Sequence, residues 1–282
     1  NNWSVSNLSV AAGAGNDSLV DTPVNGTQSD TGAGGEVVGN YATWNASIPQ
    51  TSGSGVALSN GNLDAAHDSS HAWASTGSTI AAKSGKYYAE FTVTGTLGNV
   101  MLGLNEAFEA GSSYISTVAM GDGFCIQGDT SIRNRTFAKA ASTTSQGTWS
   151  AGDVISIAID LDAGKAWTAK NGSWDFSTVS GNAFDSGNPT ATWTDLTKHY
   201  LFVVSNYDNS NVTSANFGQR SWAYSAPSSF KAFCTANLPD PTIADGSTAF
   251  DAKLYVGNGS TQTISGYGFS PDVVWTKGRD RA

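Results

Sequence analysis

The stretch that decides the fold is GDVISIAIDLDAGKAWTAKNGSW, residues Gly152–Trp174. Apolar residues occupy every second position of its first half and share one face of a strand: Ile155, Ile157, Ile159 and Leu161. The chain then turns at residues 162–164, and residues 166–169 form a return strand. This pattern predicts a β-hairpin with one buried face. Asp160 falls on the opposite face, where we expect it to meet solvent.

The turn of this hairpin also resembles part of a calcium-binding loop, because Asp160, Asp162 and Gly164 alternate. A calcium loop supplies a third oxygen ligand and a glutamate further along. Lys165 and Ala166 follow here instead, and the glutamate is missing. We therefore interpret the stretch as a hairpin turn and expect no metal there.

Alternation recurs on both sides of the hairpin. In KYYAEFTVTG (residues 86–95), one face carries Tyr87, Ala89, Phe91 and Val93, and the other carries Tyr88, Glu90, Thr92 and Thr94. Shorter strands are predicted at 99–105 and 122–128, with weaker signals at 56–58 and around Trp73. Residues 200–207 and 212–218 are expected to pair with each other across the turn between them. No amphipathic helix longer than two turns appears, so we predict an all-β, antiparallel sandwich or barrel.

Composition limits the classes of partner. Charged residues make up 13% of the 282 residues, and the net charge is −9. The 14 basic residues are scattered, which disfavours nucleic-acid binding. No run of about 18 apolar residues occurs, so no membrane insertion is expected. Cys125 and Cys234 are too few for a disulfide-dense scaffold; one bridge is possible, and two buried free thiols are favoured.

Composition also divides the chain. Residues 1–40 are rich in Gly, Asn, Asp and Ser, and are expected to form an extended connector or the end of an upstream domain. Residues 41–235 carry the strand signals of the sandwich. Residues 236–249 contain two prolines and are predicted to be a linker. Residues 250–282 begin a new β pattern that is too short for a stable domain, which predicts that the chain continues.

Motifs for catalysis or metal binding are weak. His67 and His71 lie four residues apart, but in a polar stretch without a predicted helix. Glycanases of the laminarinase type carry Glu-x-Asp-x-x-Glu on one strand, and this chain has no such motif. Glu90 is interpreted as a structural or rim residue, and no Gly-x-Ser-x-Gly elbow occurs. We therefore expect no catalytic residue, no metal and no cofactor.

Three segments in order resemble the SPRY domain, a concanavalin-like β-sandwich: SGKYYAEFTVTG (84–95), the hairpin 152–174, and YLFVVSNYDNSNVTSANFGQRSW (200–222). The resemblance covers about residues 41–235 and implies an antiparallel concanavalin-like, SPRY-type β-sandwich. The two flanks resemble modules of tailed-phage virion proteins, notably of marine phages. Those proteins string lectin-like sandwiches together in structural or tail-fibre chains.

The SPRY resemblance implies binding through loops at one end of the sandwich. The loops expected there are 105–114, 128–136, 172–190 and 207–211. Three aromatic residues in or near loops are candidates for stacking on sugars or peptide groups, or alternatively for closing the edge of the core: Trp174, Trp193 and Tyr207. Arg133 and Arg135 form a small basic spot that suits a ligand or a neighbouring subunit equally.

The virion resemblance implies a non-catalytic tail fibre or similar appendage, located on the particle surface. Its expected partners are other virion proteins, further copies in a homotrimer, and a glycan or protein of the host surface. One alternative is an architectural capsid or tail decoration protein without receptor binding. Another is a glycan-degrading enzyme, which needs two carboxylates about 5–9.5 Å apart in a groove.

Overall fold

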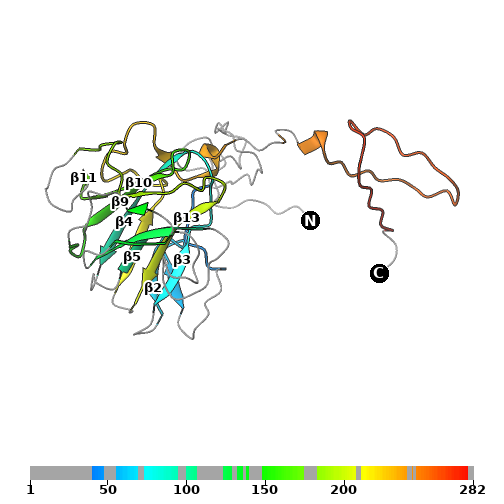
Figure 1. Ribbon diagram of the computed structural model, residues 1–282. Coiled ribbons are helices and arrows are strands. Elements are labelled where there is room, and N and C mark those ends of the chain that lie inside the picture. Colours follow the sequence, from blue (N-terminus) through cyan, green and yellow to red (C-terminus); the bar gives the residue numbers. More distant parts are fainter. Residues whose placement is uncertain are drawn as a thin grey trace. The chain divides into compact units, whose positions relative to one another are not determined.

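The computed structural model describes residues 40–47, 55–68, 73–94, 100–106, 123–128, 132–135, 138–139, 148–174, 183–207, 211–239, 243 and 246–278. The chain forms two units, residues 1–239 and 240–282. The predicted connector lies outside the described residues, apart from Asn40. The sandwich belongs to the first unit (Figure 1).

Two sheets build the sandwich. The first, ten-stranded sheet runs in the order β1 (Val56–Ser59), β2 (Asp64–His67), β14 (Val212–Asn216), β4 (Lys86–Thr94), β9 (Val154–Asp160), β10 (Lys165–Lys170), β12 (Ala191–Thr192) and β8 (Ala138–Lys139). In the same sheet, β11 (Ser173–Trp174) pairs with β10, and β15 (Lys231–Ala232) pairs with β4 in parallel. The second sheet runs in the order β3 (Ala74–Gly77), β13 (Tyr200–Asn206), β5 (Val100–Glu106), β6 (Gly123–Gln127) and β7 (Ile132–Arg135). Every other pair is antiparallel, which confirms the predicted all-β antiparallel sandwich.

The core lies between the two sheets and follows from the alternation of the strands. From the first sheet it takes Tyr87, Phe91 and the isoleucines of β9. From the second it takes alternate apolar residues of β5, β6 and β13, such as Leu102, Phe124 and Phe202. The ring centroids of Phe91 and Phe202 lie 5.9 Å apart across the two sheets. Fully burying such a side chain stabilises the fold by about 1.5–3 kcal/mol.

The hairpin prediction is confirmed, with β9 and β10 paired from Ile155↔Lys170 to Asp160↔Lys165. The prediction that Asp160 faces solvent is wrong, because the residue is only 6% exposed. Lys86 stands opposite it on β4, and its Nζ lies 2.8 Å from Oδ2 of Asp160. Oδ1 of Asp160 accepts a hydrogen bond from the backbone N–H of Ala163 at 2.9 Å. Both oxygens therefore stabilise the hairpin.

The predicted pairing of residues 200–207 with 212–218 is also wrong. Strand β13 pairs with β3 and β5 in the second sheet, whereas β14 pairs with β2 and β4 in the first. The connection between them crosses from one sheet to the other. This arrangement lets Phe202 of β13 and Ala215 of β14 enter the same core from opposite sides. Alternation fixes which residues are buried but not which strand is the neighbour.

The strands predicted in residues 250–282 are not found. Within 246–278 the structure has one regular element, the 3₁₀ helix η3 (Gly246–Thr248). Many large apolar side chains of this segment are exposed: Phe250, Leu254, Tyr255, Val256, Val273, Val274 and Trp275. A strand needs a neighbour for its backbone N–H and C=O groups, and no strand of the described residues pairs with this segment. The alternating pattern is therefore present without a sheet.

The cysteine prediction is confirmed, since Cys125 and Cys234 are both buried and neither forms a disulfide. Cys234 lies near the second 3₁₀ helix, η2 (Thr235–Asn237), at the end of the sandwich unit. Burial raises the pKa of its thiol. A raised pKa disfavours the thiolate and so makes this thiol a poor nucleophile.

Alkaline pH is expected to destabilise the sandwich through Tyr87. Its hydroxyl donates a hydrogen bond to the carbonyl of Asn237 at 3.3 Å, and burial, followed by the charges of Asp162 and Cys234, raises the pKa of Tyr87 to about 12. The folded pKa thus lies above the unfolded value of 10.0, and the folded state disfavours the phenolate. Stability is therefore fully present below about pH 10 and is lost as pH rises toward 12.

Denaturant unfolding of the wild type and of Tyr87→Phe, measured in steps of pH, checks this expectation. The Phe variant should lose part of the alkaline decline, because its ring cannot ionise. Part of the decline should remain, since burial also raises the pKa of Tyr88. Equal alkaline slopes for the two proteins would show that Tyr87 ionises as freely in the folded state as in the unfolded chain.

Candidate functional site: a pocket beside an outer aromatic cluster

The outer face of the first sheet carries a second apolar cluster, which we call the outer aromatic cluster. Its buried members come from alternate positions of neighbouring strands: Tyr88, Ala158, Trp167, Ala169 and Trp174. Phe184, Trp222, Ala226 and Phe230 pack against them from the segments 183–190 and 218–230. The face that a simple sandwich would turn to solvent is therefore covered here by two segments of the same chain.

Glu90 fastens one of these segments to the sheet. Its Oε1 accepts hydrogen bonds from the Tyr88 hydroxyl and the Tyr224 N–H, each at 2.9 Å, and its Oε2 accepts one from the Ala223 N–H at 2.8 Å. The residue is 4% exposed. This geometry agrees with the structural role expected for Glu90, since both of its oxygens are engaged in holding the chain.

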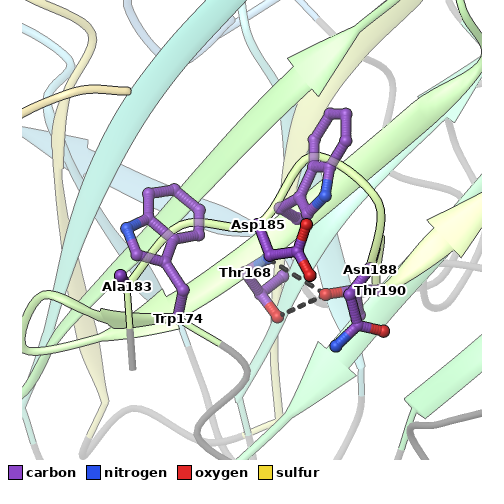
Figure 2. A pocket seen from close by; sticks show the side chains of 7 residues that line it. Thr168, Trp174, Ala183, Asp185, Asn188 and Thr190 are labelled. Atoms are coloured by element: carbon purple, nitrogen blue, oxygen red, sulfur yellow. Dashed lines mark hydrogen bonds between the residues drawn. The ribbon is translucent and has the colours of Figure 1, made fainter. Parts of the chain in front are cut away.

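A pocket of about 230 Å³ opens beside the cluster, between β10 and the segment 183–190. Two indoles, two hydroxyls, an amide and a carboxylate line it: Trp167, Trp174, Thr168, Thr190, Asn188 and Asp185, together with Ala183. Figure 2 shows Trp174 on one side of the pocket and Asn188 and Thr190 on the other, with Asp185 and Thr168 between them. The pocket is thus apolar at one side and polar at the other.

Hydrogen bonds to β10 and within the turn shape the polar side. The Thr190 hydroxyl accepts from the backbone N–H of Thr168 at 3.0 Å, and the two hydroxyls of this pair also lie 3.0 Å apart (Figure 2). Asp185 accepts the Gly187 N–H through Oδ1 at 2.8 Å, and its carbonyl accepts the Asn188 N–H at 3.1 Å. An aspartate that bonds the backbone two residues on fixes a tight turn. The segment is therefore held in shape by its own residues.

Trp167 leaves one donor unsatisfied at this site. The residue is 4% exposed, and its ring packs against Phe184 at 5.3 Å and Phe230 at 5.8 Å between centroids. In the part of the chain that the structure describes, its Nε1 has no hydrogen-bond partner. Buried polar groups without a partner are rare and mark strain, an ordered water or a ligand position.

Among the predicted binding residues whose side chains are described, the structure does not bring Trp174, Trp193 and Tyr207 together. Trp174 lies in the pocket wall, 7% exposed and packed against Phe184 at 5.0 Å. Trp193 lies in the core between the sheets, 6% exposed, which agrees with the alternative that it closes the core edge. Tyr207 is half-buried and contacts Trp73 at 5.4 Å beside a small apolar cluster of the second sheet. Arg133 and Arg135 lie on β7, and their side chains are outside the described residues.

The expectation that all candidate loops share one end of the sandwich is wrong. Strand register pairs Tyr200 with Glu106 at one end of β13, and Asn206 with Val100 at the other. The chain after Glu106 and the chain after Asn206 therefore leave from opposite ends. The pocket lies beside β10, between that strand and residues 183–190. The end-loop expectation failed because β5 and β13 are antiparallel neighbours, so the chain leaves the two strands at opposite ends.

Sequence reasoning missed Trp167, Asp185, Asn188 and Thr190. Trp167 was assigned only to a return strand, although its place opposite Ala166 and Thr168 in the alternation puts it on the outer face. The turn residues Asp-Ser-Gly-Asn at 185–188 mark a tight loop, and residues 172–190 were expected to contribute to binding. No local pattern shows that this loop folds over Trp167.

The described residues include neither a metal-binding cluster nor a membrane-spanning helix. Among the described residues, no group of three or more His, Cys, Asp or Glu side chains is placed to hold a metal ion. His67 is buried, with Nδ1 3.7 Å from Asp68, and His71 lies outside the described ranges. Within those same ranges no helix is long and apolar enough to cross a membrane.

Comparisons with known proteins give two kinds of likeness. Residues 245–282 match a family described as "Domain of unknown function (DUF7483)". The chain is similar to the crystal structure of the SPRY domain of human HERC1, at 15% identity and a TM-score of 0.45, over 63% of this chain and 99% of that one. It is also similar to the TRIM65 PSpry domain, at 15% identity and a TM-score of 0.41, over 63% of this chain and 92% of that one. No curated protein matches the sequence.

The two sheets of this chain, rather than these likenesses, establish its sandwich fold. At such low identity, no ligand or partner can be carried over from the two SPRY domains. The family match covers only the second unit and describes no function. The comparisons do not bear on the virion role, which stays a prediction.

Proposed function

We propose that this protein is a non-catalytic attachment protein, of the tail-fibre type found on tailed-phage particles, which binds a host-surface glycan. The observation that carries the attachment role is the pocket, because it sets two indoles beside a carboxylate, an amide and two hydroxyls. Binding sites for small ligands combine apolar walls with a few placed polar groups in this way. A hydroxyl-rich ligand such as a sugar can use both.

The positions of the aspartate and glutamate carboxylates support the non-catalytic role. Hydrolysis of a glycan needs two carboxyl groups that flank the scissile bond. Asp185 is the one carboxylate among the residues that line the pocket. Outside the pocket, the carboxylate oxygens of Glu90 accept hydrogen bonds and a carboxylate oxygen of Asp160 forms an ion pair, and both interactions stabilise the fold. Binding without turnover is therefore the simpler role for this chain.

The virion setting is supported by the low content of charged residues and by the resemblance of the flanks to virion modules. The test uses the full chain, purified and fluorescently labelled, with mass measured by light scattering and binding measured on bacterial cells and on phage particles. We expect an oligomer that binds a cell surface and that cells stripped of surface glycan no longer bind. A stable monomer without affinity for any cell or particle would overturn the proposal.

A second candidate is an architectural component of the particle without receptor binding. The exposed apolar residues of the second unit favour it, for example Val256 at 86% and Trp275 at 89%, because such side chains suit burial against another chain. Gold-labelled antibodies against the protein, viewed on particles, separate the two roles. Label at a fibre tip favours attachment, whereas label along the capsid or tail wall favours the architectural role.

A further inference from the structure

The pocket allows the ligand class to be named more closely, and this step rests on the proposed attachment role. We infer that the pocket formed by Trp167, Trp174 and the 185–190 turn binds a single uncharged, hydroxyl-bearing ring, such as one hexose unit of a glycan. Three features of the pocket lead to this class: its size, its charge and its free donor.

Size limits the ligand to one small unit. The pocket measures about 230 Å³, whereas pockets for drug-sized ligands measure roughly 300–1,000 Å³. The indoles also contribute less open surface than a stacking platform, because Trp174 already packs against Phe184 and Tyr88. A ring that enters the pocket must therefore be held mainly by hydrogen bonds.

The charge of the pocket disfavours anions. The carboxylate of Asp185 lines the pocket, and none of the other lining residues is a lysine or arginine. A sialic acid, a uronic acid or a phosphate would meet this carboxylate without compensation. Hydroxyl groups, in contrast, donate to a carboxylate, and a hydrogen bond to a charged acceptor is about twice as strong as a neutral one.

The third feature is the indole N–H of Trp167, which calls for an acceptor on the ligand. Nε1–H of Trp167 has no partner within the described structure, and an indole nitrogen can only donate. Asp185 can only accept. A ligand that satisfies both must carry acceptors and donors on one small unit, as the adjacent hydroxyls of a sugar ring do. Because Nε1 is buried, a ligand reaches it only if neighbouring side chains move.

The test follows the indole N–H signals of the nine tryptophans by NMR in the full chain. Loss of one signal in Trp167→Phe assigns it, and the other retained signals show that the variant folds. Uncharged monosaccharides, sialic acid, trimethylammonium and a short peptide are titrated separately. We expect the Trp167 signal to shift with an uncharged sugar at a roughly millimolar Kd, as suits a small ligand.

Two variants and a matched control make the test specific. Asp185→Asn and Trp167→Phe should each weaken sugar binding roughly threefold to tenfold, the effect of losing one hydrogen bond. Asp195→Asn should change nothing, although Asp195 is also an exposed aspartate, with Oδ1 bonded to the N–H two residues on at 3.0 Å. No shift of Trp167 with any sugar, equal losses in the control, or tighter binding of the anion, the cation or the peptide would overturn the inference.

Cell binding separates this inference from the proposed function. If the labelled wild type binds cells and the two pocket variants bind equally well, the pocket assignment fails while the attachment role stands. If the wild type binds no cell, the attachment role itself fails. If cell binding falls in the two pocket variants and not in Asp195→Asn, both stand.

Discussion

Gly103→Ala is expected to lower the free energy of unfolding of the sandwich by about 3 kcal/mol. Gly103 lies on β5, opposite Cys125 of β6. A Cβ added there would overlap the carbonyl oxygen of Phe124 and lie 2.7 Å from Cα of Cys125. Backbone atoms cannot turn away as a side chain can, so β5 and β6 would have to separate. Circular dichroism during heating should show Tm falling by roughly 6–12 °C.

A second glycine provides the control for this substitution. Gly246 has no atom within 4 Å of an added Cβ, and its backbone is not in the left-handed region. Gly246→Ala should therefore leave stability within about 0.5 kcal/mol of the wild type. If Gly103→Ala melts together with the control, the close approach of β5 and β6 would be wrong.

The sequence predicted which segments form strands better than it predicted which strands pair. Alternation identified β4, β9 and β10, because the side chains of a strand point to opposite faces at successive residues. It did not reveal that β13 and β14 lie in different sheets. A hairpin within one sheet and a crossing between two sheets leave the same pattern in the sequence. The second unit shows the same limit, because its β pattern predicted strands where residues 246–278 form none.

Contacts between distant residues explain what sequence missed at the site. Asp160 appeared solvent-facing because alternation reports a face, and only the register with Lys86 shows that the face is covered. Trp174 was found because it follows a turn, whereas Trp167 was hidden in a strand whose outer side looked exposed. The covering segment 218–230 comes from beyond the last long strand, and no periodicity connects it to β10.

Because Glu90 holds this covering segment to the sheet, its substitution is expected to lower the free energy of unfolding strongly. Glu90→Ala would leave the N–H groups of Ala223 and Tyr224 without their acceptor, and the Tyr88 hydroxyl would keep only Ser156, at 2.9 Å. A hydrogen bond to a charged acceptor contributes about 1.5–3 kcal/mol. Because these two are only part-buried, we expect a total loss of about 3 kcal/mol. Denaturant unfolding measures the loss, and hydrogen exchange should show the amides of residues 223 and 224 losing protection first.

Two further substitutions test whether the hydrogen bonds of Glu90 cause this loss. Glu90→Gln keeps one acceptor oxygen and places an NH₂ against an N–H, so its loss should be roughly half as large. Glu106→Ala removes another glutamate at a strand position, but one whose ion pair with Lys198 at 2.9 Å is near the surface. That change should cost about 1 kcal/mol or less.

A less ordered segment 218–230 should also change the shape of the pocket, because Phe230 of that segment packs against Trp167. Sugar binding by Glu90→Gln should therefore weaken, although Glu90 does not line the pocket. The Trp167 indole signal should shift in this variant even without sugar, which a change in global stability alone would not cause. If Glu90→Gln loses stability while the Trp167 signal and sugar affinity stay unchanged, the covering segment and the pocket are independent, and Glu90 serves the fold alone.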